Sequence, residues 1–316
     1  MKYALKRVFM LLITMILVSF LTFLAFELVS GDPAQAMLGT QATPARVEAL
    51  RQELGLNRPF LVRYFSWLGG FFSGNLGLSY SYKQPVWELI APKLEITLCM
   101  CFLSFLIIVL VSIPLGIQSA RWVGGPMDWV RTSFNQLCMA VPPFFTGILV
   151  SWGFGILLRL FTPGDFPSLH GHFLAAMKYL FFAAICLGIP RTAMTVRMLR
   201  STLISEMEKA YVRTAISRGN DRRGVLHTHV LKNSLVSAIT FLGQTMAELV
   251  GGSIVVEQVF GIPGLGRLLV ASIANRDYPV VEAIVVILAF WVVLAGTVAD
   301  LLNQRIDPRL RLGGAA

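Results

Sequence analysis

Six apolar runs, each long enough to cross a bilayer, alternate with polar connections along the chain. A hydrocarbon core needs about 20 residues of α-helix, and each run reaches this length. A spanning segment must also satisfy its own backbone hydrogen bonds, which a helix does. We therefore predict an all-α polytopic membrane protein with six transmembrane helices. The predicted spans are residues 8–29, 98–120, 134–160, 173–193, 235–256 and 280–302.

The composition agrees with this class of protein. Of the 316 residues, 55% are hydrophobic and 14% are charged. In soluble proteins, about a quarter of all residues are charged. Four prolines, at positions 114, 142, 143 and 190, lie in or beside the predicted spans. Bundled membrane helices tolerate proline because neighbouring helices satisfy the freed carbonyls. The four prolines are therefore compatible with the predicted spans.

The distribution of basic residues predicts the orientation. The connection 191–233 holds nine Lys and Arg residues against three acidic ones. The N-terminus adds Lys2, Lys6 and Arg7, and the C-terminal tail adds Arg305, Arg309 and Arg311. Because Lys and Arg accumulate on the cytoplasmic side of a membrane protein, both termini and this connection are expected inside the cell. The net charge of +10 therefore does not require a nucleic-acid partner.

The long first connection is expected to form a small extracytoplasmic helical cap. Residues 44–54 and the aromatic-rich residues 60–72 are predicted to be helices, separated by a turn at Asn57-Arg58-Pro59. The predicted organisation is an N-terminus and first helix at 1–29, the cap at 30–93 and a five-helix transmembrane domain at 94–316. The domain contains a cytoplasmic loop at 200–233.

A short helix is predicted inside that loop, over residues 206–219. Ser205 is expected to cap its first turn, Glu208 to return the bond and Gly219 to end it in a left-handed conformation. A small apolar face at helical spacing consists of Met207, Ala210, Tyr211 and Ala215. From spacing alone, this face is equally compatible with a partner's groove and with the anionic lipid surface.

The sequence contains no recognisable catalytic, metal or cofactor site. It has no phosphate-binding glycine loop, no H-E-x-x-H and no G-x-S-x-G. If such a membrane protein transports a solute, the energy must come from an ion gradient or from another subunit. One residue, Glu248, lies well inside the fifth predicted span, where an ionisable side chain is costly unless it faces a partner or a watery cavity.

The cytoplasmic loop resembles that of a known family. It contains Tyr211-Val212-Arg213-Thr214-Ala215, then Gly219, then His229-Val230-Leu231-Lys232-Asn233. This order resembles the coupling loop of ATP-binding-cassette importer permeases, in particular the first permease subunit of the peptide/nickel class. The general importer pattern is Glu-Ala-Ala, three residues and Gly. Here Arg213-Thr214-Ala215 takes its place, and the missing glutamate is typical of the peptide branch.

The resemblance extends over almost the whole chain. Each piece is weakly specific, but their order over six spans is highly specific. The further pieces are Gly31-Asp32-Pro33, Glu53-Leu54-Gly55-Leu56-Asn57-Arg58-Pro59, Gly77-Leu78-Ser79, Gly251-Gly252-Ser253, Pro263-Gly264-Leu265-Gly266-Arg267, Asn275-Arg276-Asp277-Tyr278-Pro279 and Asp307-Pro308-Arg309.

The resemblance implies a permease subunit of a binding-protein-dependent, ATP-driven importer in the cell inner membrane. The implied partners are a second permease, two ATPase subunits, an extracytoplasmic solute-binding protein and membrane lipid; no cofactor resides in this chain. Hydrolysis of ATP belongs to the partners. Seven residues are the implied ATPase-coupling set, namely Met207, Ala210, Tyr211, Arg213, Thr214, Ala215 and Gly219. The candidate translocation-pathway residues are Glu248, Gly252 and Ser253.

Two other classes of protein are considered. A gradient-driven secondary transporter would need paired intramembrane ion sites and usually inverted repeats, of which the sequence shows neither. An intramembrane enzyme would need a nucleophile with a base, or a metal constellation. The substrate stays open between peptides, nickel, metal chelates and glutathione-like molecules. The glutamate before Leu249-Val250-Gly251-Gly252 is more similar to nickel-type permeases and favours nickel slightly.

Overall fold

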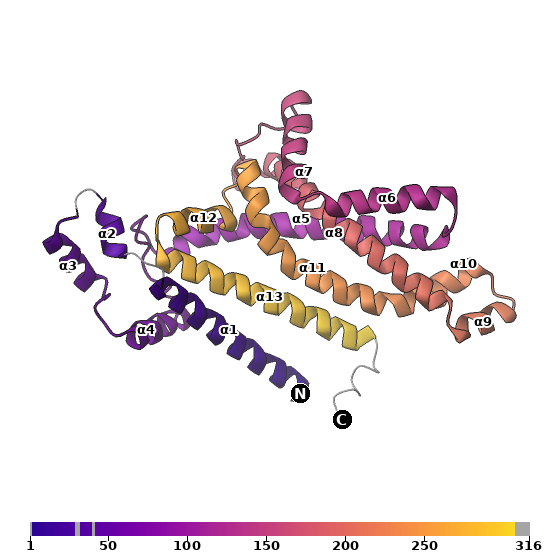
Figure 1. Cartoon of the computed structure of the whole chain (residues 1–316), viewed down its shortest axis with the longest axis horizontal. Coiled ribbons are helices and arrows are strands. Elements are labelled where there is room, and N and C mark those ends of the chain that lie inside the picture. Colours follow the sequence, from indigo (N-terminus) through magenta and orange to yellow (C-terminus); the bar gives the residue numbers. More distant parts are fainter. Residues whose placement is uncertain (1, 29–31, 40–41, 307–316) are drawn as a thin grey trace. The chain divides into compact units, whose positions relative to one another are not determined.

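A computed structural model describes residues 2–28, 32–39 and 42–306. Gly31, the tail residues Arg309 and Arg311 and the segment Asp307-Pro308-Arg309 lie outside the described residues. In the described part, the chain forms helices and a single isolated antiparallel bridge between Leu78 and Pro85. The predicted all-α class is therefore confirmed (Figure 1).

Five helices in the described part are long and apolar enough to cross a membrane. They are the Phe9–Leu28 part of α1 (Lys2–Leu28), α5 (Val86–Arg121), α8 (Phe173–Met207), a helix that includes α11 (Leu231–Phe260), and α13 (Tyr278–Ile306) up to Asn303. A bent pair of helices supplies a sixth candidate span.

The third predicted span, 134–160, is not the single helix that the hydropathy suggests. Helix α6 (Pro126–Ala140) ends before Pro142. Helix α7 (Pro143–Val150) continues into the π-helix η2 (Ser151–Leu157), and this second segment is bent by 97° from α6. A proline lacks an N–H and forces the preceding residue out of the helical region. Val141 and Pro142 accordingly have extended ψ angles of 121° and 146°. The isolated Pro114 and Pro190 stay inside continuous helices, as predicted.

The chain divides into two compact units. Unit 1 comprises residues 1–97 and 263–293, and unit 2 comprises residues 98–262 and 294–316. Unit 1 contains α1, α2 (Pro33–Leu38), α3 (Pro44–Glu53), α4 (Phe60–Phe72) and α12 (Leu265–Ala274). Unit 2 contains α6 to α8, α9 (Ala210–Ser217), α10 (Arg222–Val225), the π-helix η3 (Leu226–Val230) and α11. Helices α5 and α13 contribute residues to both.

In unit 1, aromatic packing attaches the cap to α1. The rings of Phe20 and Phe23 make edge-to-face contacts with Phe60 and Tyr64 of α4, at centroid separations of 5.3 to 5.8 Å. The Tyr64 hydroxyl also lies 3.0 Å from Ser19 Oγ. Both cap helices predicted from sequence, 44–54 and 60–72, are present with nearly the predicted bounds. The amphipathic face of α4 is therefore buried against α1.

A second attachment in unit 1 joins two sequence signatures that lie almost 200 residues apart. The buried carboxylate of Asp277 accepts a 2.5 Å hydrogen bond from Ser79 Oγ and backbone hydrogen bonds from Tyr80 and Ser81, at 2.9 and 3.2 Å. The Thr97 hydroxyl accepts a bond of 2.8 Å from the Leu265 N–H at the start of α12. These bonds hold the loop before α5 against the α12–α13 junction.

In unit 2, α8 is the central helix, and the other helices pack against it. The Asn135 amide of α6 donates to the Ala193 carbonyl at 2.9 Å, and Arg200 donates to Asp128 at 2.8 Å. On another side, Gly252 of α11 approaches Leu187 so closely that a Cβ at position 252 would lie 3.0 Å from its Cδ1. The missing side chain of Gly252 therefore allows this close contact between the two helices.

Candidate functional site

The short cytoplasmic-loop helix exists, but it begins later than the capping pattern predicts. Helix α8 runs through Ser205 and Glu206 to Met207, and α9 starts at Ala210 after an extended Lys209 that makes no side-chain cap bond. The predicted capping box of Ser205 and Glu208 is therefore wrong. Buried Leu199, Leu203 and Glu206 continue the inward stripe of α8 at helical spacing, so packing extends α8 past the predicted cap.

The predicted end of the helix is confirmed. Gly219 has a φ of +91°, and its N–H donates to the Ile216 carbonyl at 2.9 Å. The Asn220 N–H reaches back to the Ala215 carbonyl at 3.4 Å. These two bonds form a Schellman motif, which favours glycine because other residues rarely adopt a positive φ.

A closed triangle of polar side chains fixes α9 to two long helices. The Tyr211 hydroxyl of α9 donates to Glu206 Oε1 of α8 at 2.9 Å. Asn233 of α11 donates one amide hydrogen to the same carboxylate oxygen at 3.2 Å and the other to the Tyr211 hydroxyl at 3.1 Å. Lys209 adds an ion pair of 2.5 Å to Glu206.

The triangle is well suited to hold Tyr211 as a neutral hydrogen-bond donor. Burial raises the pKa of the Tyr211 hydroxyl; the Asn233 amide lowers it in part, and the Glu206 carboxylate raises it again. Glu206 is 8% exposed, so its charge is satisfied by this set of donors rather than by bulk water. The first turn of α9 is therefore tied to α8 and α11 together.

An apolar contact also holds α9 in place. Val212 is 1% exposed and belongs to a cluster with Leu199 and Leu203 of α8 and with residues of α10, η3 and α11. Met207, Tyr211 and Ala215 pack against the same cluster. Three of the four residues of the predicted apolar face thus point to the chain's own core and not to a partner's groove. The helical spacing identified this apolar face, but it did not show that the face packs against the chain's own core.

The outward face of α9 carries the rest of the predicted coupling set. Ala210, Arg213, Thr214 and Gly219 are exposed, and Ile216 is 43% exposed between them. Figure 1 shows α9 and α10 at one end of the α8–α11 pair. The chain therefore presents a short basic helix with one apolar side chain, held from behind by two spanning helices.

The second candidate site is an ion pair within the same two helices. Arg191 of α8 donates to the Glu248 carboxylate of α11, and their side chains are 30% and 53% exposed. The sequence singled out Glu248 but not Arg191, although an arginine directly after Pro190 in an apolar run was a usable signal. The other predicted pathway residues lie inside unit 2: Gly252 faces Leu187, and Ser253 is 1% exposed and donates to the Val250 carbonyl.

Comparison with known proteins identifies the class. The family described as binding-protein-dependent transport system inner membrane component matches residues 112–312, and the N-terminal family of the same membrane components matches residues 1–101. The chain therefore belongs to the inner membrane components of binding-protein-dependent transport systems. It is an ATP-binding-cassette importer permease of the peptide/nickel class, as the sequence resemblance implied.

Curated relatives match the chain over nearly its full length. A peptide transport system permease protein of Brucella abortus is 37% identical over 97% of this chain and 98% of the relative. The oligopeptide transport system permease protein AppB of Bacillus subtilis is 33% identical over 98% of both chains. The nickel import system permease protein NikB of Staphylococcus aureus is 31% identical over 98% of this chain and 92% of its own. The chain is thus a multi-pass inner membrane transport subunit, in a family that works with ATPase and substrate-binding partners.

Proposed function

We propose that this chain and a second, similar permease form the pathway of an ATP-driven importer of small peptides. A solute-binding protein delivers the peptide outside the cell, and two ATPase subunits bind beneath, one of them at α9. Both termini lie in the cytoplasm, in line with the basic residues of the 191–233 loop. The proposal is supported most by the fixation of α9 to α8 and α11 through Tyr211, Glu206 and Asn233.

The fixation suggests how force passes from the ATPase to the pathway. When the ATPase subunits close on ATP, they push on Ala210, Arg213 and Thr214. Because Tyr211 joins α9 to both helices, the push moves α8 and α11 together and not α9 alone. The movement is a rigid-body rocking between inward-facing and outward-facing states. In this proposal, Tyr211 and Ala215 position the helix, and the exposed residues make the contact.

The Arg191–Glu248 pair is proposed to line the pathway. A partly exposed ion pair within a span is expensive against lipid tails, so it is expected to face a watery cavity or the second permease. A neutralised pair presents both an anionic and a cationic group to cargo, as the two ends of a peptide require. Glu248 already has a cationic partner, which weakens the preference for nickel suggested by the sequence.

Reconstitution with the partners tests this function. Proteoliposomes that contain both permeases, the ATPase subunits and the binding protein should accumulate a labelled dipeptide only when ATP is present on the side of the membrane that carries the ATPase subunits. Accumulation of labelled nickel instead would assign the other cargo. Accumulation driven by a proton or sodium gradient without ATP would favour the secondary transporter and contradict the proposal.

A further inference from the structure

A cavity of about 790 Å³ lies within unit 1, and the function proposed above gives it no role. It is lined by the end of α1, the segment that joins α3 to α4, α4 itself, the loop near Tyr80 and the start of α13. Its volume falls in the range of small-ligand sites, about 300–1,000 Å³. In the proposed orientation, it lies at the extracytoplasmic side.

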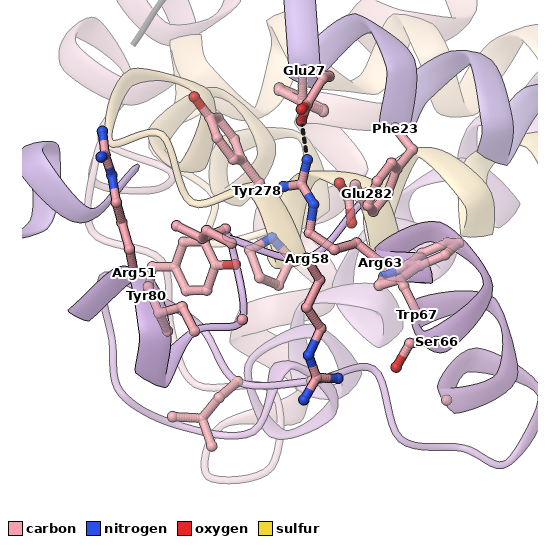
Figure 2. A pocket seen from close by; sticks show the side chains of 18 of the residues that line it. Phe23, Glu27, Arg51, Arg58, Arg63, Ser66, Trp67, Tyr80, Tyr278 and Glu282 are labelled. Atoms are coloured by element: carbon pink, nitrogen blue, oxygen red, sulfur yellow. Dashed lines mark hydrogen bonds and ion pairs between the residues drawn. The ribbon is translucent and has the colours of Figure 1, made fainter. Parts of the chain in front are cut away.

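Two of the residues that line this cavity each carry a shielded donor atom without a partner in the described part of the chain. These atoms are Arg63 Nε and the indole Nε1 of Trp67. A 2.6 Å ion pair between Arg63 Nη2 and Glu27 holds the guanidinium in place, while Nε stays unused (Figure 2). Buried donors are nearly always hydrogen-bonded, so two unpartnered donors on residues beside one cavity favour a ligand with acceptor atoms there.

A buried acidic residue is among the charged residues that line the cavity. Glu282 is 6% exposed and lines the cavity near Arg63, and among the described residues its carboxylate accepts no hydrogen bond. The field of this carboxylate reaches the loop on the other side of the cavity. Burial raises the pKa of Tyr80 to about 12, and the carboxylates of Glu282 and Asp277 contribute to the increase.

Another part of the wall is aromatic. Phe23 and Phe26 of α1, Trp67 of α4 and Tyr278 of α13 all line the cavity. The Phe26 and Tyr278 rings pack at 4.9 Å, and Phe23 contacts Trp67 at 6.4 Å. Large fixed rings of this kind accept apolar side chains of varied shape.

We propose that this cavity binds a small zwitterionic peptide, a proposal that rests on the peptide cargo above. Arg63 Nε and Trp67 Nε1 donate to its terminal carboxylate, Glu282 attracts its α-ammonium, and the aromatic rings contact its side chains. The permease thus holds peptide on its extracytoplasmic side independently of the binding protein.

Direct binding tests the inference. The purified permease–ATPase complex, without binding protein or ATP, is placed in nanodiscs of phosphatidylglycerol, and isothermal titration calorimetry measures binding of the dipeptide Ala-Phe. We expect saturable binding that weakens at least about tenfold for Ala-Phe amide, because the amide lacks the carboxylate. Absence of Ala-Phe binding, or equal binding of its amide, would overturn the inference.

Matched variants locate the site. Trp67→Phe retains an aromatic ring and removes the donor, and Glu282→Gln removes the ionisable carboxyl group. Each should weaken Ala-Phe binding about tenfold. Trp87→Phe and Glu88→Gln change the same residue types at exposed positions outside the cavity and should leave binding unchanged. Equal affinity in Trp67→Phe and the parent, with both correctly assembled by size-exclusion chromatography, would contradict the inference.

Two further comparisons separate the competing explanations. If the cavity holds a zwitterionic lipid headgroup, phosphatidylethanolamine in the nanodisc abolishes Ala-Phe binding, and the peptide assignment fails. ATP-driven dipeptide uptake with the binding protein is measured in parallel. Uptake without direct binding would refute this site and leave the proposed function intact. Direct binding without ATP-driven uptake would refute the proposed function.

Discussion

Asn233 on α11 donates a 3.2 Å hydrogen bond to Glu206 on α8, and the same two helices pair again fifteen residues away on each. There Arg191 of α8 contacts Glu248 of α11. At 1.5 Å per residue, the two cross-links are about 22 Å apart. Antiparallel helices linked at both positions move as one body, so a displacement of α9 reaches Glu248 with little loss.

Removal of the Tyr211 hydroxyl should uncouple ATP hydrolysis from transport. Tyr211→Phe loses the bonds to Glu206 and Asn233 and retains the ring that packs on the core. A hydrogen bond at this partly exposed position contributes about 1 kcal/mol, so the ratio of the state with α9 held in place to the state with α9 released falls roughly fivefold. The measurement is ATP hydrolysed per dipeptide transported, which should rise. Tyr82→Phe, at an exposed loop position, is the control, and an equal ratio in both variants would contradict the role of Tyr211.

The end of α9 should require glycine. Gly219→Ala places a Cβ at a φ of +91° and should lower stability by about 1 kcal/mol or more. Thermal unfolding of the complex and ATPase stimulation by the loaded binding protein measure the effect. Gly69→Ala lies in α4 with open space around its Cβ and should be neutral or slightly stabilising. If Gly219→Ala matched that control, the Schellman ending would have no importance for coupling.

The intramembrane pair should depend on its charges. Arg191→Gln or Glu248→Gln leaves the other charge unpaired in a span, and transport should fall about tenfold or more. The double variant Arg191→Glu with Glu248→Arg restores a neutral pair and should recover part of the dipeptide uptake. A double variant no better than either single substitution would show that the residues act separately.

Two glycines in unit 2 should respond differently to replacement by alanine. A Cβ at position 243 of α11 would lie 2.0 Å from Ala299 Cβ of α13, whereas a Cβ at position 296 meets nothing within 4 Å. Gly243→Ala should therefore destabilise the protein by about 1–3 kcal/mol through overpacking. Gly296→Ala should not. Thermal melting followed by size-exclusion chromatography compares them, and equal melting temperatures would refute this packing.

The elements with local signals were predictable from the sequence. Pro59 precedes an aromatic amphipathic run that ends before Ser73-Gly74, and α4 has the predicted bounds of 60–72. Gly219 ended α9 as expected, because a positive φ is a local requirement that glycine meets.

Predictions that depended on distant neighbours were less accurate. The capping pattern at Ser205 was overridden because Leu203 and Glu206 extend α8 into packed surroundings. The apolar pattern continues through Pro142 and Pro143 and therefore did not reveal the bend of 97° between α6 and the segment formed by α7 and η2. The Arg191–Glu248 ion pair joins two separate helices, and the cavity beside Arg63 is lined by residues of several helices. The periodicity of a single segment does not reveal such contacts.

Site-specific photo-crosslinking from α9 tests the central claim most directly. A benzoylphenylalanine at position 214, on the outward face of α9, should crosslink to the ATPase subunit in the assembled complex. The same residue at position 62, exposed on α4 of the cap, should not. A crosslink from position 214 that strengthens when ATP is bound is the predicted result. A crosslink to lipid alone, in an intact complex that still transports, would contradict the account.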